Sequence, residues 1–150
     1  GDAVVVRRAP MTSAHVGQHW IGTYENGLGD GATGTLTSKP FRVTQPWAAF
    51  LFAAGPFEST RVELVDAADQ KVMLKVSGND TRQLAKSNQS TETLAPVIVD
   101  LRAVQGRDLF IRVIDEQAGG AWGHVNFDDF KFYAGKPVLA GAVEPVTTGR

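Results

Sequence analysis

The chain of 150 residues contains no cysteine. Disulfide bonds, thiolate metal sites and cysteine nucleophiles are therefore excluded together. Long apolar runs are also missing, because the longest, residues 47–55, is far shorter than the roughly 20 residues that a membrane-spanning helix needs. Neither sign of charge is in excess, since 15 Lys and Arg oppose 16 Asp and Glu. We therefore expect neither a nucleic-acid interface nor insertion into a membrane.

β-Branched residues and glycine are abundant instead. Val, Ile and Thr make up 33 of the 150 residues, and Gly makes up 16. β-Branched side chains fit pleated strands, and glycines fit the tight turns between them. Apolar segments recur at short intervals with turn residues between them, at 34–38, 41–44, 47–53, 61–66, 71–76, 96–101, 109–115 and 124–133. About eight strands without intervening helices predict an all-β, two-sheet antiparallel sandwich.

The organisation of the chain follows from the same segments. We expect an N-terminal extension over residues 1–18, one sandwich module over 19–135 and a C-terminal tail over 136–150. The polar stretch 80–93 has no convincing helical period, so it predicts a long loop with at most one helical turn.

Candidate chemistry gathers around a glycine-rich loop late in the chain. Trp122 directly follows Gly119-Gly120-Ala121, His124 comes two residues later, and Asp115-Glu116 lies just upstream. The large ring of Trp122 is either a plug between the sheets or a surface offered to a ligand. Sugars present C–H faces to aromatic rings, and their hydroxyls suit planar partners such as Arg and carboxylates. Both interpretations of Trp122 stay open at this point.

Other patterns give weaker signals. Residues 29–34 match the G-x-G-x-x-G string of dinucleotide-binding proteins, but a strand-like segment follows where a helix is needed. His15 and His19 have the spacing of a helical metal pair but lack the H-E-x-x-H pattern. The pairs Asp115-Glu116 and Asp128-Asp129 could serve a glycosidase or a structural calcium ion bound by distant segments. Solvated charge at the edges of the sandwich is the simpler interpretation.

The final strand carries a resemblance to a known family. Residues 119–130, with the sequence GGAWGHVNFDDF, resemble the hallmark of the levan-binding carbohydrate-binding modules attached to levanases and related fructan hydrolases. The whole string is also similar to domains of large exported planctomycete-type proteins that carry cytochrome c domains. Further pieces that match the levan-binding modules occur in the expected order, at 33–38, 41, 53–55, 60–64, 100–101 and 110–115. The segments 19–25 and 46–48 match the second group of domains. Ala121 departs from the family pattern, because it lengthens the Gly-Gly-Trp spacing by one residue.

The resemblance implies a jelly roll of the galactose-binding-like type with no catalytic residues. It implies a module that tethers a larger multidomain protein, outside the cell or in the periplasm, to a polysaccharide or oligosaccharide, with a fructan as the named candidate. The alternative is a structural or protein-interaction sandwich without a sugar site, and a small glycan-active enzyme ranks last. No cofactor is expected beyond the structural calcium ion that remains open.

The expected site lies among the loops 55–61 and 116–124, joined by the loop 23–30. Trp122 would pack on a sugar face, while Arg61 and His124 would bind hydroxyl groups. The candidate acceptors are the carboxylates of Glu25, Glu58 and Glu116.

Overall fold

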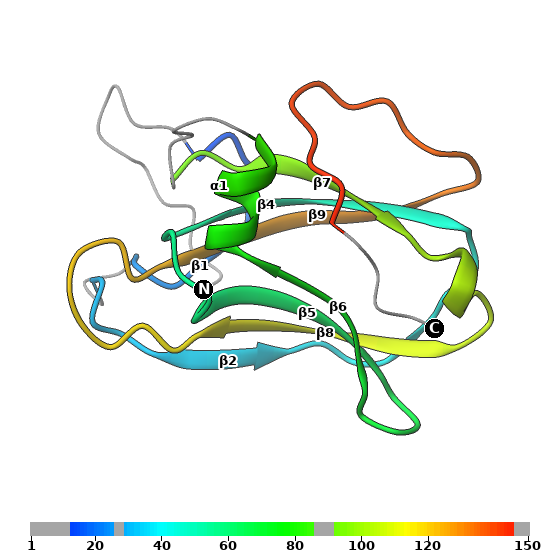
Figure 1. Ribbon diagram of the computed structural model, residues 1–150, viewed down its shortest axis with the longest axis horizontal. Coiled ribbons are helices and arrows are strands. Elements are labelled where there is room, and N and C mark those ends of the chain that lie inside the picture. Colours follow the sequence, from blue (N-terminus) through cyan, green and yellow to red (C-terminus); the bar gives the residue numbers. More distant parts are fainter. Residues whose placement is uncertain (1–12, 26–28, 86–91, 146–150) are drawn as a thin grey trace.

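The computed structural model describes residues 13–25, 29–85 and 92–145, and in these ranges nine strands form two sheets that pack face to face (Figure 1). The first sheet has the order β1-β9-β4-β7, from Ile21–Gly22, Val125–Tyr133, Trp47–Ala54 and Ala95–Asp100. The second has the order β2-β8-β5-β6, from Gly34–Thr37, Asp108–Asp115, Thr60–Asp66 and Val72–Ser77. The short strand β3, Phe41–Arg42, pairs with the beginning of β8. All strand pairs are antiparallel, so the predicted two-sheet sandwich is confirmed.

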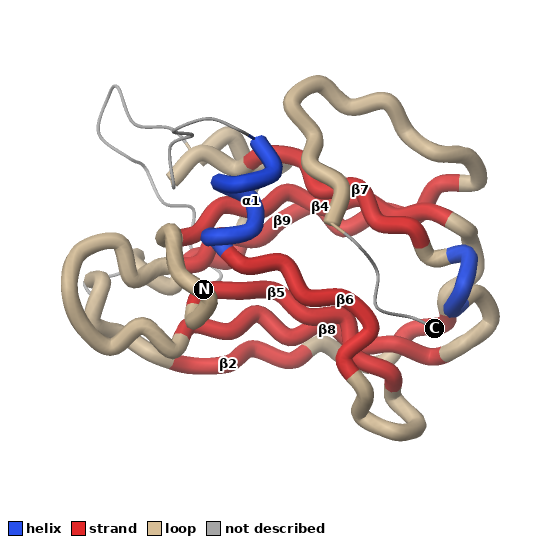
Figure 2. Tube along the Cα trace, viewed as in Figure 1, coloured by secondary structure: helices blue, strands red, loops and turns tan. Residues whose placement is uncertain are grey.

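Strands dominate the fold, as Figure 2 shows. Each of the eight predicted strands is present, and its bounds differ from the prediction by at most two residues. The ninth, β1, has only two residues, which is too short to give a periodic signal in the sequence.

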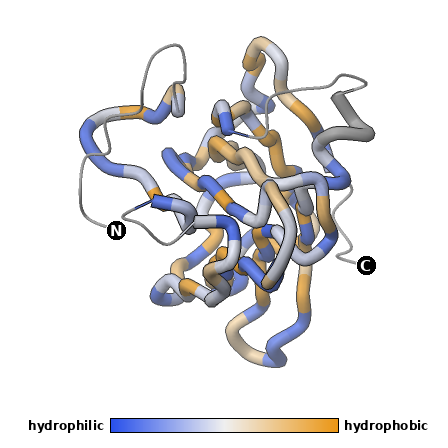
Figure 3. Tube along the Cα trace, turned by 90° about the vertical axis from the view of Figure 1, so that its left-hand side faces the viewer, coloured by the Kyte–Doolittle hydropathy of each residue, from blue (hydrophilic) through white to orange (hydrophobic). Residues whose placement is uncertain are grey.

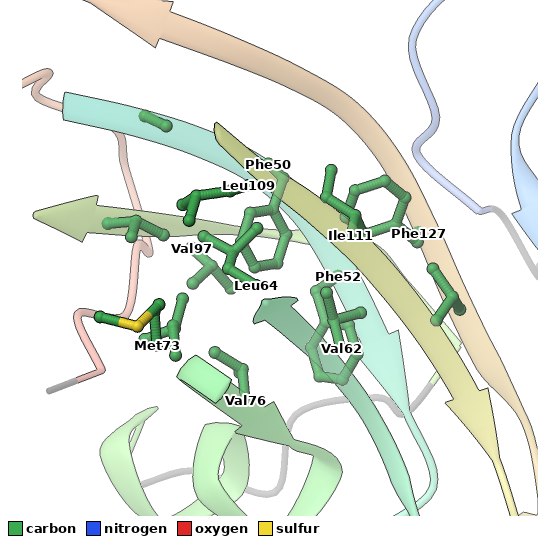
Figure 4. Packing of buried hydrophobic residues seen from close by; sticks show 14 of the residues in the cluster. Phe50, Phe52, Val62, Leu64, Met73, Val76, Val97, Leu109, Ile111 and Phe127 are labelled. Atoms are coloured by element: carbon green, nitrogen blue, oxygen red, sulfur yellow. The ribbon is translucent and has the colours of Figure 1, made fainter. Parts of the chain in front are cut away.

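Alternate residues of the strands meet between the sheets and form the core (Figure 4). Phe50 and Phe52 of β4 face Val62 and Leu64 of β5, and each of these four side chains is at most 2% exposed. Burying one such side chain contributes about 1.5–3 kcal/mol. This period of two explains why the strand pattern was readable in the sequence.

The prediction of a loop after β6 is wrong in its first part. Helix α1, Gly78–Ala85, occupies two turns there. It begins at a capping box, because the Ser77 hydroxyl accepts a hydrogen bond from the Asp80 N–H at 3.1 Å and the Asp80 carboxylate accepts one from the Ser77 N–H at 3.0 Å. The rest of the predicted loop includes residues 86–91, which lie outside the described ranges.

The other short helix is a 3-10 turn, Arg102–Val104, between β7 and β8. Over the described part of the chain, no helix has both the length and the apolar character needed to cross a membrane.

The segment after β9 folds back along β7. Val143 is 6% exposed and forms a parallel bridge to Val97. The Ile98 N–H donates to the Val143 carbonyl at 2.9 Å, and the Val143 N–H donates to the Pro96 carbonyl at 3.0 Å. Val143 therefore packs against the edge of the first sheet, whereas Val138, earlier in the same segment, is almost fully exposed.

We expect Phe52→Ala to lower the free energy of unfolding by about 3–5 kcal/mol, because it removes a ring that is 2% exposed and leaves a cavity. The matched control is Leu36→Ala on β2, whose side chain is half exposed and which should change stability by at most about 0.5 kcal/mol. Chemical denaturation measures both values. Equal losses in the two variants would contradict the described packing.

Candidate functional site

Three loops meet at one end of the sandwich. They are the β1–β2 loop (described over residues 23–25 and 29–33), the β4–β5 loop (55–59) and the β8–β9 loop (116–124). Because β4 pairs with β9 and β5 pairs with β8, the end of β4 and the start of β5 lie beside the ends that carry the β8–β9 loop. Figure 1 shows this loop end on the left, and Figure 3 looks directly onto it.

Backbone hydrogen bonds join the β4–β5 and β8–β9 loops. The Gly55 N–H donates to the His124 carbonyl at 3.0 Å, and the Glu116 N–H donates to the Ser59 carbonyl at 2.9 Å. The Ser59 hydroxyl adds a bond of 2.7 Å to the side-chain carbonyl of Gln117. These contacts hold both ends of the β8–β9 loop in place.

Asp115 connects the β1–β2 loop to the β8–β9 loop through hydrogen bonds. One of its carboxylate oxygens accepts from the Thr23 hydroxyl at 2.6 Å, and the other accepts from the Gln117 N–H at 3.2 Å. The Thr23 hydroxyl oxygen in turn accepts from the Val125 N–H at 2.9 Å. Asp115 is 1% exposed, so this carboxylate serves the loop structure.

Trp122 stands out in the β8–β9 loop. Its side chain is 51% exposed, so the interpretation of Trp122 as a plug between the sheets is wrong. Its φ of 74° lies in the left-handed region, which non-glycine residues enter only where the surrounding structure holds them. The His124 N–H donates to the Trp122 carbonyl at 3.0 Å and supplies part of that restraint. The ring is thus presented at the surface from a fixed backbone.

Arg61 is locked between two carboxylates. Its Nη1 lies 2.6 Å from Glu116 Oε2, and its Nε lies 2.8 Å from Glu63 Oε1. The other oxygen of Glu63 lies 2.8 Å from Nη2 of Arg112, so that carboxylate, 8% exposed, sits between two guanidinium groups. The structure therefore brings together two of the predicted site residues, Arg61 and Glu116, in one ion pair.

The Arg61–Glu116 ion pair shifts the pKa of both of its members. The hydrogen bond from Arg61 lowers the pKa of Glu116 below its ordinary value. Conversely, the hydrogen bond to Glu116 raises the pKa of Arg61. Both groups are charged at neutral pH, and the side chain of Glu116 remains 59% exposed.

Glu58 has partners outside the Arg61 pair. Its carboxylate lies 2.8 Å from the Lys75 ammonium of β6 and accepts from the Asn79 amide of α1 at 2.9 Å. The hydrogen bond from Lys75, followed by the one from Asn79, lowers the pKa of Glu58. Glu58 is exposed and therefore accessible, but it belongs to the side of the loop end that faces α1.

His124 and Glu25 were expected to contact a ligand, but both are less exposed than Trp122 and Glu116. His124 is 3% exposed, and its Nδ1 lies 3.6 Å from Asp30 Oδ1 of the β1–β2 loop. At this depth the imidazole packs between loop and strand and does not present its edge to the surface. The half-buried carboxylate of Glu25 lies against Gly22, in β1.

Tyr24 is a surface aromatic that the sequence reasoning missed. It is 48% exposed, and its ring meets the His124 ring edge-on with a centroid distance of 6.5 Å. The signal was available, because Tyr24 directly precedes the candidate Glu25 in a loop that was already expected at the site. The loop end therefore exposes two aromatic rings and the carboxylate of Glu116, whose partner Arg61 is largely buried.

This arrangement can offer apolar ring faces alongside fixed hydrogen-bond donors and acceptors. In the described residues, no three His, Asp or Glu side chains are grouped as a metal site would need. The paired carboxylates Asp128-Asp129 lie in β9, where Asp128 accepts from the Val16 N–H at 2.7 Å and Asp129 lies 2.8 Å from Lys131 Nζ.

Arg61→Ala is expected to lower the free energy of unfolding by about 1–3 kcal/mol, because it removes a partner of the buried Glu63. Arg42→Ala is the matched control, since Arg42 and its partner Asp108 are both largely exposed and such pairs contribute about 0–1 kcal/mol. Urea unfolding at neutral pH compares the two. A smaller loss for Arg61→Ala than for Arg42→Ala would contradict the structural role of the Glu63 carboxylate.

Comparisons with known proteins are sparse. No family model matches the chain, and no solved structure matches it. A protein of Aspergillus rugulosus named "Putative glycosyl hydrolase ecdE" is 31% identical over 116 residues, which are 77% of this chain and 14% of that protein. The chain thus spans a small part of a relative whose name concerns carbohydrate chemistry.

Proposed function

We propose that this sandwich is a non-catalytic carbohydrate-binding module and that its ligand binds at the loop end. The observation that carries the proposal is the half-exposed ring of Trp122, held on a strained backbone in the same loop as Glu116. Strain of this kind is found where the surrounding structure fixes a functional geometry. A backbone that is already fixed loses little conformational entropy when a ligand packs on the ring that it carries.

The Arg61–Glu116 pair supplies the polar half of the proposed recognition. Its two side chains are planar and oppositely charged, so neighbouring sugar hydroxyls can donate to the carboxylate and accept from the guanidinium. The pair has no net charge, which favours a largely neutral glycan over an acidic one. The specific ligand that we propose is a fructan, bound as a polysaccharide or oligosaccharide.

Two observations support a binding role without catalysis. Asp115, one member of the carboxylate pair nearest the loop end, is buried and uses both oxygens to hold loops. The relative with the glycosyl hydrolase name is matched over only 14% of its length, as expected for an attached module. The proposal therefore includes a larger multidomain parent protein that this module tethers to a glycan outside the cell or in the periplasm.

Trp122→Ala should weaken glycan binding by at least about 30-fold, which corresponds to about 2 kcal/mol, because it removes the ring that packs on the sugar. Isothermal titration calorimetry with levan, inulin and an acidic polysaccharide measures the affinities. The control is Leu36→Ala, which removes a similarly exposed apolar side chain on β2 and should bind like the wild type. Circular dichroism establishes that both variants are folded.

If the folded wild-type protein binds none of these glycans at millimolar concentration, the proposal fails and a structural or protein-interaction role takes its place. Preferential binding of the acidic polysaccharide would overturn the neutral-ligand part alone. Release of reducing sugar from any of the three by the purified domain would overturn the absence of catalysis.

A further inference from the structure

Two glycines lie directly behind the loop that carries Trp122. Gly55 directly follows β4, and Gly78 is the first residue of α1, immediately after β6. Gly55 lies in the connection from β4 to β5, and Gly78 lies in the connection from β6 to β7. The two glycines are 23 residues apart in the sequence, yet their backbones are in contact at the loop end.

Gly55 leaves room only for a hydrogen atom on the side that faces Trp122. A Cβ at this position would overlap the Trp122 carbonyl oxygen and lie 2.8 Å from its carbonyl carbon and 3.2 Å from the ring of Phe57. Carbon atoms in ordinary contact are about 3.5–4.0 Å apart. Any side chain at 55 would therefore push the Trp122 backbone outward.

Gly78 lies against the Gly55 backbone in the same way that Gly55 lies against the Trp122 backbone. A Cβ there would overlap the Gly55 carbonyl oxygen and lie 2.8 Å from its carbonyl carbon and 3.1 Å from the carbonyl oxygen of Ala54. Neither Gly55 nor Gly78 has a positive φ, so it is space and not backbone conformation that requires glycine at both positions.

Three backbones are thus stacked in direct contact, from α1 through the end of β4 to Trp122. The first layer is fixed by the capping box of Ser77 and Asp80, and the last by the bond from the Gly55 N–H to the His124 carbonyl at 3.0 Å. A strained φ of 74° at Trp122 persists only under such restraint.

We propose that Gly55 and Gly78 are positioning residues for Trp122 and that α1, packed behind them, determines the position of the Trp122 ring. Through this stack, a helix that carries none of the proposed ligand contacts of Trp122, Arg61 or Glu116 controls the affinity of the site. The effect on affinity depends on the proposed function, whereas the effect on the position of the ring does not.

The test is Gly78→Ala, measured by the indole N–H resonance of Trp122 in a ¹⁵N–¹H correlation spectrum and by calorimetry with levan. The resonance is assigned from its loss in Trp122→Phe. We expect Gly78→Ala to shift this resonance and to weaken binding about tenfold or more, with the sandwich still folded. The matched control is Gly135→Ala, after β9, because a Cβ at this glycine meets open space.

Asp80→Ala is the second variant, since it loosens the start of α1 without adding atoms to the stack. It should shift the same resonance by a smaller amount, and it decides the question if Gly78→Ala does not fold. An unchanged Trp122 resonance in the folded variants would overturn the inference, as would an equal shift in Gly135→Ala. If the wild type binds no glycan, the proposed function fails, and the resonance still decides whether the glycines position the ring.

Discussion

Burial of one apolar layer between the two sheets is the constraint on which the rest of the structure depends. Slipping a strand by one residue would exchange its inward and outward faces, so the buried residues of β4 and β5 fix the register of both sheets. Once that register is set, the end of β4 must lie beside the start of β9, and the start of β5 beside the end of β8. The meeting of Arg61 with Glu116 is a direct result of this pairing.

The parts of the fold that follow a period of two were predictable from the sequence, and the others were not. The strands were recognisable in the sequence because alternate residues had to be apolar. Helix α1 is short and polar, so the Ser77–Asp80 capping pattern was its only signal in the sequence. The nearness of Arg61 and Glu116 could be anticipated because both lie at ends of strands. The burial of His124 could not, since it depends on how the β1–β2 loop folds over the start of β9.

In the proposed module, charge fixes the orientation of Arg61, and shape determines which ligand fits the loop end. Arg61 is compensated by a buried carboxylate on one side and an exposed one on the other, so the guanidinium is held in orientation but adds no net charge. Selectivity would then come from the match between ring faces, hydroxyl positions and a rigid backbone. The match to the Aspergillus rugulosus protein covers 116 residues, which are 14% of that protein.

The segment that follows β9 has an effect beyond its own packing. Strand β7 is the last in its sheet, and without a cover its unpaired N–H and C=O groups would form a template for a strand from another molecule. The bonds from Ile98 to Val143 and from Val143 to Pro96 occupy part of that template. The chain therefore covers part of this edge with its own polypeptide, which disfavours pairing of β7 with a strand from another molecule.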